Sequence, residues 1–280
     1  MGELPTNLTH KFRSVDRLCP KLAATRPGLS AGWNWPPRTP EASKKFYSEL
    51  LGLTWTDMPM SETMVYTMLQ KDDRFVGAMF QIHEQMLAQG MHPHWVCYIS
   101  TDDVEAATSL VRNAGGNVIN EPFDVFTAGR MSVVADPTGA TFGIWQAGEH
   151  IGAGLIHEPG SLGWNELYTT DTEAANTFYA SVFGWDRSTH QVGPEAEDYH
   201  EFKLGDVNVA GMIQIKPHWG EVPPNWGSYF CVEDIETSFQ KALDMGAHVV
   251  VPVMRETNIS FCYMHDPQEV YFGLVQVLGQ

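Results

Sequence analysis

Glu166 is the residue whose surroundings point most directly to chemistry, because it lies between aromatic residues in the segment Trp164-Asn-Glu-Leu-Tyr168. In an extended strand, side chains two residues apart point to the same face, so Glu166 shares a face with Trp164. A carboxylate in an aromatic cavity can serve as a general base. Alternatively, it could be an edge carboxylate paired with an arginine or with backbone amides. We predict Glu166 as a catalytic residue.

Three histidines could add acid–base or ligand-binding groups. His200 opens a strand-like run and is predicted to face a cavity, and His265 stands directly before an Asp-Pro turn. His94 follows His92 by two residues on an extended segment, so the two could share a face. The alternatives are a solvent-facing loop residue for His94 and a strand-end residue bonded to the backbone for His265. We assign His200 and His265 to the catalytic set.

The predicted strands carry many flat side chains and a few amides. Aromatic walls with amide and phenol groups suit a planar, weakly polar organic ligand, so the expected partner is a small aromatic or hydrophobic molecule. Most of the aromatic rings must also contribute to the core. The predicted ligand-binding residues are Trp35, Tyr66, Gln81, His94, Tyr98, Trp145, Trp164, Gln214 and Tyr229.

A tandem duplication positions these residues. Three segments recur in the same order, at separations of 132, 131 and 130 residues. The period is far longer than a solenoid unit, so each copy is predicted to be a complete module. Two such modules facing each other form a cleft, where function is expected. The matching segments are 39–52 with 171–184, 94–105 with 225–236, and 136–146 with 266–276.

Each copy is predicted to contain a short opening strand, a helix, two strands, a third strand, a second helix and a final pair of strands. The first helix begins at the N-cap Thr39 and ends at Gly52; in the second copy Asp171 and Gly184 have these roles. An Asp-Pro turn joins the final strands. The predicted parts of this α+β chain are an arm at 1–30, modules at 31–147 and 163–280, and a linker at 148–162.

Composition narrows the classes of function. A chain of 280 residues with 43% hydrophobic content has room for two modules. A formal charge of −17 argues against binding to nucleic acid or to an anionic membrane. No apolar run approaches the length of a membrane span, and the N-terminus has no hydrophobic run of a signal peptide. The four cysteines form no C-x-x-C pair, which indicates reduced thiols. We expect a cytoplasmic monomer or homodimer.

The duplicated motifs together resemble the vicinal oxygen chelate superfamily, which includes glyoxalase I, extradiol dioxygenases and bleomycin-resistance proteins. These motifs are a helix that carries Phe-Tyr and ends at glycine, a strand that ends in an acidic pair before a second helix, and an Asp-Pro hairpin. The resemblance covers roughly residues 31–278 and is closest to two-domain glyoxalase-like proteins. It implies a tandem pair of glyoxalase-like modules, each built from βαβββ units with a curved mixed sheet that encloses a cleft.

Metal-dependent members of that superfamily take their ligands from three strand positions: an early His, a His before the acidic pair and a Glu in the final strand. A catalytic metal needs about three protein ligands from His, Asp, Glu or Cys, and no such side chain stands at the matching positions here. The resemblance therefore implies that the usual metal site is absent, and no cofactor is predicted. The matching positions are Gly32, Val96 and Gly143 in the first copy and Trp164, Gly227 and Gly273 in the second.

Three functions remain open. The first is a metal-independent enzyme of secondary metabolism or detoxification that acts on an aromatic or polyketide-like molecule as a lyase, isomerase, cyclase or cofactor-free oxygenase. The second is a non-catalytic binding protein of the bleomycin-resistance type, and the third is a metal-dependent glyoxalase or dioxygenase with displaced ligands. Glu166 corresponds to Asn34 in the first copy. This asymmetry indicates one specialised site and favours the enzyme.

Overall fold

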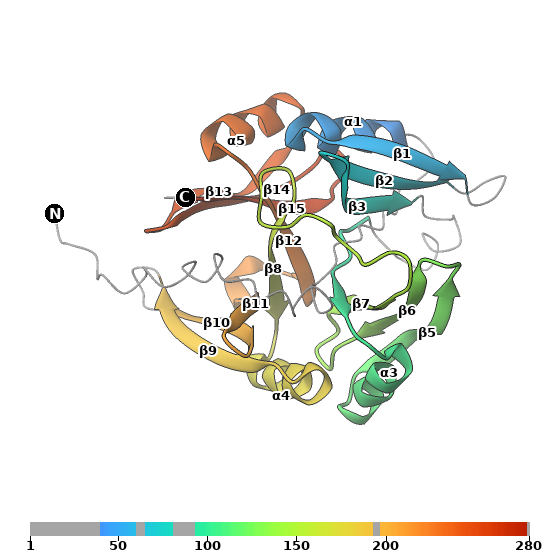
Figure 1. Cartoon of the computed structure of the whole chain (residues 1–280). Helices are drawn as coiled ribbons and strands as arrows, with labels where there is room; N and C mark the ends of the chain where they lie inside the picture. Colours follow the sequence, from blue (N-terminus) through green and yellow to red (C-terminus); the bar gives the residue numbers. More distant parts are fainter. Residues whose placement is uncertain (1–39, 60–64, 81–92, 193–196, 279–280) are drawn as a thin grey trace.

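The structure, a computed structural model, describes residues 40–59, 65–80, 93–192 and 197–278. In the second copy, eight strands form a single mixed sheet, which α4 (Thr172–Phe183) and α5 (Ile235–Asp244) cover on one face (Figure 1). The strands are β8 (Leu162–Thr169), β9 (Asp186–Val192), β10 (Glu197–Leu204), β11 (Val207–Gln214), β12 (Asn225–Cys231), β13 (His248–Arg255), β14 (Ile259–His265) and β15 (Tyr271–Val277).

The order of strands across this sheet is β13-β14-β15-β12-β8-β11-β10-β9. It consists of two βαβββ units, β8-α4-β9-β10-β11 and β12-α5-β13-β14-β15, joined by antiparallel pairing of β8 with β12. Within each unit the first strand pairs in parallel with the last, β8 with β11 and β12 with β15. The sheet confirms the predicted α+β fold with a mixed sheet of βαβββ units.

The described part of the first copy forms two smaller sheets, ordered β1-β2-β3 and β4-β7-β6-β5, with helices α1 and α3. Residues 148–161 then lead from β7 to β8, with an isolated bridge between Ile156 and Leu162 as their regular pairing. The predicted arm at 1–30 lies outside the described residues. The elements are α1 (Pro40–Leu51), β1 (Thr54–Pro59), β2 (Val65–Lys71), β3 (Arg74–Phe80), β4 (Tyr98–Ser100), α3 (Val104–Asn113), β5 (Asn117–Val125), β6 (Gly129–Ala135) and β7 (Thr141–Ala147).

The helix ends follow from local chemistry. The Asp171 side chain accepts hydrogen bonds from the backbone N–H groups of Glu173 and Ala174, which have no partner inside the helix. Gly184 ends α4 at φ 66°, a left-handed conformation that glycine adopts at low cost. The predicted start and end of this helix are confirmed. The predicted N-cap Thr39 of α1 lies outside the described residues.

The four strands that directly follow the helices, β1, β9, β5 and β13, were not predicted from the sequence. These four strands stand at the edges of their sheets. An edge strand can expose the side chains of both its faces to solvent, so neither face has to be apolar. All six residues of β1 are exposed, and β5 and β13 are mostly exposed. The alternation of apolar and polar residues that reveals a half-buried strand is therefore weak in these segments.

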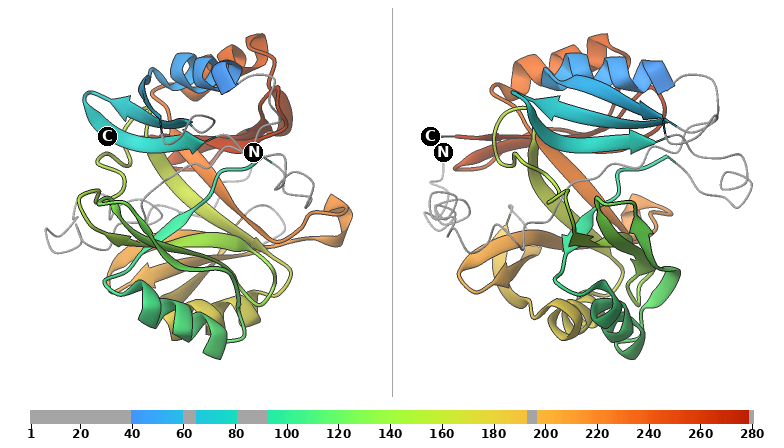
Figure 2. Two further views of the ribbon diagram at one scale, coloured as in Figure 1. Left: turned by 90° about the vertical axis from the view of Figure 1, so that its right-hand side faces the viewer. Right: turned by 45° about the vertical axis from the view of Figure 1, so that its right-hand side comes forward.

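The two copies share their hydrophobic cores. Helix α1 lies beside α5, and α3 lies beside α4, in both the front and the rotated views (Figures 1 and 2). One core packs Phe46 and Leu50 of α1 against Phe272 of β15. The other core packs Phe142 of β7 against Phe178 of α4. Each core therefore contains residues from both copies. The helices of neither copy cover a core made of that copy alone.

A buried aromatic pair recurs at the centre of each core. Trp95 donates a hydrogen bond to the Tyr47 hydroxyl at 3.2 Å, and Trp226 donates to the Tyr179 hydroxyl at 2.9 Å. The repeated Phe-Tyr motif is thus core packing. No helix in the described part of the chain is long and apolar enough to cross a membrane.

Candidate functional site

Glu166 lies on the face of the eight-stranded sheet opposite α4 and α5, which we call the inner face. Its neighbour Leu167 packs into the core beneath α4, so alternation turns Glu166 to the other side. The Glu166 side chain is almost fully buried, with 4% exposure. Tyr199 donates a hydrogen bond to Oε2 at 3.0 Å, and Trp164 Nε1 donates to the Tyr199 hydroxyl at 3.1 Å. The predicted aromatic surroundings of this carboxylate are therefore present.

Glycines on both neighbouring strands make room for the carboxylate. Glu166 is paired with Gly227 of β12 on one side and with Gly211 of β11 on the other. A Cβ atom at Gly211 would lie 2.2 Å from the Tyr199 hydroxyl and 2.5 Å from Glu166 Oε1. Any larger residue at position 211 would therefore displace the Tyr199–Glu166 hydrogen bond.

Three tyrosines stand beside Glu166 on the inner face. The hydroxyls of Tyr168 and Tyr229 are 2.7 Å apart and form a hydrogen bond. The Tyr263 ring centroid lies 5.4 Å from that of Tyr229 and 5.9 Å from that of Tyr168. Burial raises the pKa of Tyr168 and Tyr229 well above the usual tyrosine value, and the negative charge of Glu166 raises it further. These phenols therefore stay protonated at neutral pH.

The inner face also contains the three positions that correspond to superfamily metal ligands in this copy. Gly227 is the cross-strand partner of Glu166, and Trp164 of β8 and Gly273 of β15 are paired with Tyr229 on its two sides. A Cβ atom at Gly273 would lie 2.0 Å from Tyr229 Cδ1, and one at Gly227 would lie 2.8 Å from Tyr168 Cε2. Tyrosine rings occupy the space that ligand side chains at these glycines would need.

The residues at these three positions therefore do not fit the metal ion that metal-dependent members of the superfamily bind. The first copy repeats the arrangement, because a Cβ atom at Gly143 would lie 2.4 Å from Tyr98 Cδ1. Over the residues that the structure describes, no three His, Cys, Asp or Glu side chains form a group that could hold a metal ion.

Of the predicted site residues, the structure brings together Glu166, Trp164 and Tyr229. His265 also belongs to the inner face, two residues beyond Tyr263 on β14, but at the end of the strand. Its ring stacks on His248 at 4.8 Å between centroids, and its Nδ1 lies 3.2 Å from the Asp266 carbonyl. This matches the strand-end alternative and separates His265 from the tyrosine pair.

His200 and Gln214 do not share the inner face, contrary to expectation. His200 lies two residues before Phe202, which is buried in the core beneath α4, and its Nδ1 contacts Thr189 Oγ1 at 2.9 Å. Burial lowers the pKa of His200. Gln214 follows the core residue Met212 by two residues on β11 and so lies on the same face as Met212, and its amide donates to the Thr170 carbonyl at 2.7 Å.

Three of the predicted ligand-binding residues of the first copy, Tyr66, Tyr98 and Trp145, lie in the smaller sheets. Tyr98 donates to the Met131 sulfur at 3.9 Å, and Trp145 donates to the His150 carbonyl at 3.1 Å. The Tyr66 ring stacks on Phe80 at 6.2 Å. His94 is half-buried just before β4. The remaining two, Trp35 and Gln81, lie outside the described residues.

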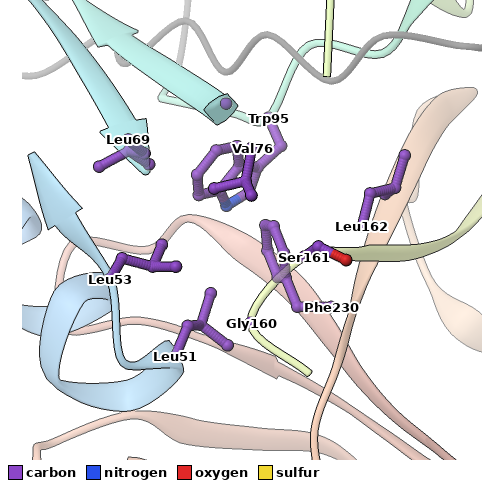
Figure 3. A pocket seen from close by; sticks show the side chains of 10 residues that line it. Leu51, Leu53, Leu69, Val76, Trp95, Gly160, Ser161, Leu162 and Phe230 are labelled. Carbon is purple, nitrogen blue, oxygen red and sulfur yellow. The ribbon is translucent and has the colours of Figure 1, made fainter. Parts of the chain in front are cut away.

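The junction between the copies contains a small cavity (Figure 3). Its volume is about 10 Å³, the space of roughly one water molecule. It opens between the two copies, but it is too small for an organic ligand. The side chains that line it are apolar except for that of Ser161. They include Leu51, Leu53, Leu69, Val76, Trp95, Leu162 and Phe230.

The structure adds Tyr199 and Tyr168 to the site, which sequence reasoning missed. The predicted strand began at His200, one residue too late to include Tyr199, whereas β10 begins at Glu197. Alternation over the full strand places Tyr199 and Glu201 on the face opposite Phe202. Glu201 is buried there and contacts His190 Nε2 at 3.0 Å.

The comparisons with known proteins agree with this architecture. The family model described as Glyoxalase/Bleomycin resistance protein/Dioxygenase superfamily matches residues 36–144. The structure of the Mn(II)-bound glyoxalase from Novosphingobium aromaticivorans superimposes with a TM-score of 0.63 at 15% identity, over 91% of this chain and 84% of that one. The 2,3-dioxygenase LapB from Pseudomonas sp. KL28 gives a TM-score of 0.63 at 15% identity, over 91% and 92% of the two chains. These structures share the fold.

The chain belongs to the glyoxalase/bleomycin resistance protein/dioxygenase superfamily. A relative in Mycobacterium tuberculosis (strain CDC 1551 / Oshkosh), named "Putative glyoxylase CFP32", is 36% identical over 241 residues, which cover 85% of this chain and 91% of the relative. The anthracycline biosynthesis protein DnrV of Streptomyces peucetius is 34% identical over 233 residues, which cover 80% of this chain and 84% of DnrV.

Proposed function

We propose that this protein is a metal-independent enzyme that moves a proton on a planar aromatic or polyketide-like small molecule, with Glu166 as the general base. The observation that carries the proposal is the buried Glu166 carboxylate, bonded to Tyr199 and surrounded by aromatic rings. A positioned carboxylate with little water around it can remove a proton from the carbon next to a carbonyl group.

Tyr199 acts as the positioning residue for that base. Its hydroxyl donates to Glu166 Oε2 and accepts from Trp164 Nε1, so the carboxylate is held in one orientation. Burial and the charge of Glu166 raise the pKa of Tyr199 well above its usual value. Tyr199 therefore remains a hydrogen-bond donor over the neutral pH range.

Two observations support the metal-free and aromatic parts of the proposal. Tyr229 and Tyr168 fill the space over Gly273 and Gly227, where metal ligands of the superfamily would stand. Two relatives, DnrV and DauV, are named for anthracycline biosynthesis. Anthracyclines contain fused planar rings, which fit an inner face lined with tyrosine and tryptophan.

The proposal also includes the location, partners and oligomeric state of the protein. Cys97, Cys231 and Cys262 are free, buried thiols, which supports a cytoplasmic location. The charge of −17 makes nucleic acid an unfavourable partner. Because both copies share their cores within one chain, a monomer can be complete, although a homodimer is compatible with the same fold.

The test is solvent deuterium exchange at the α-carbon of 2-tetralone in D2O, followed by NMR. We expect wild-type protein to accelerate exchange and Glu166→Gln to lose the acceleration by about 100-fold or more. Glu166→Asp should retain part of it, because the base is kept but moved. Glu121→Gln, on the exposed surface of the first copy, is the matched control.

The outcomes separate the candidate functions. Binding of 2-tetralone without exchange would favour the non-catalytic binding protein. Exchange that Glu166→Gln leaves unchanged would remove Glu166 as the base. A stoichiometric metal in the purified protein, with exchange that depends on it, would favour the metalloenzyme with displaced ligands.

A further inference from the structure

We propose that the hydrogen-bonded hydroxyls of Tyr168 and Tyr229 bind the carbonyl oxygen of the substrate and stabilise it as an enolate when Glu166 takes the proton. This inference rests on the proposed function and supplies its second half. Proton removal next to a carbonyl needs a base at the carbon and a donor at the oxygen where negative charge develops. In the superfamily a metal can take the second role, and here the rings of the tyrosine pair occupy the space over Gly227 and Gly273, two of the metal-ligand positions.

The strand pairing places this donor next to the base. Tyr168 follows Glu166 by two residues on β8, so both side chains are on the inner face. Tyr229 follows Gly227 by two residues on β12, and Gly227 is the cross-strand partner of Glu166. The Tyr168–Tyr229 hydrogen bond therefore spans Gly227, on the strand directly beside the carboxylate.

The two glycines are what make this arrangement possible. A Cβ atom at Gly227 would lie 2.8 Å from both Tyr168 Cε2 and the Tyr263 hydroxyl. A Cβ atom at Gly273 would lie 2.0 Å from Tyr229 Cδ1. Glycine at both positions lets the tyrosine rings lie against the sheet, with the hydroxyls of Tyr168 and Tyr229 2.7 Å apart.

Proton counting shows that the pair can donate outward. Two hydroxyls carry two protons, and their mutual 2.7 Å hydrogen bond uses one. The second proton, on the hydroxyl that accepts this bond, is available to a ligand. The hydroxyl that accepts the bond is not weakened as a donor. The bond it accepts polarises its own O–H group and strengthens the hydrogen bond that it can donate to a ligand. Burial raises the pKa of both tyrosines, so neither gives up its proton to become a base.

The charge in the site stays constant during the step. The carbon–hydrogen bond next to the carbonyl breaks, and its proton forms a new bond to a Glu166 oxygen. The electron pair of that bond becomes the carbon–carbon double bond of the enolate, while the carbonyl π pair moves to the oxygen. The carboxylate loses its negative charge as the oxygen gains one. Return of the proton to a different carbon gives an isomer, and no oxidant or reductant is needed.

The first copy lacks this combination. Tyr98 corresponds to Tyr229, but its hydroxyl contacts the Met131 sulfur. At the offset of 132 residues, Asn34 stands in place of Glu166 and Pro36 in place of Tyr168. The base and the phenol pair therefore occur together in the second copy, and the substrate class assigned to it is an enolisable carbonyl compound with fused aromatic rings.

Ionised 2-naphthol is a suitable probe, because it is a planar aromatic oxyanion that resembles an enolate and its fluorescence differs from that of the neutral form. The parent protein for the test is Glu166→Gln, which imitates the base after it has taken the proton. We expect it to bind ionised 2-naphthol at least tenfold more tightly than wild type does, because a like charge has been removed.

In this parent, Tyr168→Phe and Tyr229→Phe should each weaken binding of the ionised probe by about tenfold to a hundredfold, the range for a hydrogen bond to a charged group. Tyr271→Phe removes a hydroxyl from the exposed end of the same aromatic group and should change binding less than twofold. Unfolding midpoints measured in urea for all variants show whether each remains folded.

The experiments distinguish an error about the tyrosine pair as the oxyanion site from an error about Glu166 as the base. If ionised 2-naphthol does not bind the parent, or if both tyrosine variants bind it as tightly as the parent, the oxyanion site is wrong. The exchange of 2-tetralone by wild type and by Glu166→Gln decides the role of Glu166 independently. Exchange lost in Glu166→Gln but unaltered in both tyrosine variants would leave the base and overturn the phenol pair.

Discussion

Tyr179 of α4 donates a hydrogen bond to the Asp136 carboxylate, with 3.2 Å between Oη and Oδ2, and so joins a helix of the second copy to the β6–β7 turn of the first. The same hydroxyl accepts the hydrogen bond of Trp226. At the other junction, burial and the negative charge of Asp266 in the second copy raise the pKa of the Tyr47 hydroxyl of the first copy, so these two side chains are also close neighbours. The repeated tyrosine and the repeated Asp-Pro turn therefore connect the copies in both directions.

Tyr179→Phe should lower the free energy of unfolding by roughly 2–4 kcal/mol, because it leaves two buried polar groups, the Asp136 carboxylate and the Trp226 indole N–H, without this partner. Urea denaturation followed by circular dichroism measures the change. Tyr271→Phe, at a 52% exposed position, should stay within about 0.5 kcal/mol of wild type. A Tyr179→Phe protein as stable as this control would contradict the junction.

The stability of the protein should depend on Asp266 in a defined pH window. Burial raises the pKa of Asp266 from 3.8 to about 6, so the folded state holds this proton more tightly than the unfolded state. The contribution is fully present below about pH 3.8 and is lost as the pH rises through about 6. For the Asp266 shift, linkage gives a loss of about 2 kcal/mol between pH 4.5 and 7.

Asp266→Asn should remove that part of the pH dependence, since an amide can still accept the backbone hydrogen bonds of Gln268 and Val270. Urea unfolding at pH 4.5 and 7 measures it, with Asp206→Asn in the exposed β10–β11 turn as the matched change. An equal dependence on pH in wild type and Asp266→Asn would show that Asp266 does not titrate in this window.

Gly273→Ala should destabilise the protein by about 1–3 kcal/mol, because the new Cβ atom would lie 2.0 Å from the Tyr229 ring and force it to move. In a Tyr229→Ala background the same change should cost much less, which a double-mutant cycle measures. Gly154→Ala is the control, because its nearest heavy atom would lie at 3.5 Å. Equal costs with and without the Tyr229 ring would refute the contact.

Removal of divalent metals should not alter catalysis if the tyrosine pair has the role that we propose. We expect dialysis against EDTA to leave the exchange rate of 2-tetralone and the urea midpoint unchanged, and elemental analysis to find less than about 0.1 metal ion per chain. Loss of exchange on dialysis, restored by one added metal, would count against the metal-free reaction.

Much of the fold could be predicted from the sequence because duplication doubles each weak pattern. Asp171 and Gly184 mark the ends of α4 by their own chemistry, and the Asp-Pro turns mark the last hairpins. The edge strands escaped prediction because their exposed residues show little alternation. The exchange of cores between copies was also beyond prediction, since the apolar face of a helix does not indicate which sheet will cover it.

The site was predicted in part for a related reason. Glu166 and Trp164 could be predicted because they are two residues apart in a segment with a clear strand pattern. Alternation then places both side chains on one face. Tyr199 was missed because the start of β10 was placed three residues late, and His200, predicted to face the cavity, shares the core face of Phe202, two residues further along β10. The tyrosine pair could not be predicted, because the hydrogen bond between Tyr168 and Tyr229 depends on how β8 and β12 align.

The shared cores have a consequence for how such a chain can evolve. A substitution in α1 or α4 is felt by both copies, so the helices of the two copies must change together. The inner face of the second copy carries no such constraint, because Tyr229, Tyr263 and the other rings on it pack with residues of that copy alone. One copy could therefore keep Asn34 while the other acquired Glu166, without loss of the common framework. A symmetric dimer of single copies cannot diverge in this way, because every mutation appears in both of its halves.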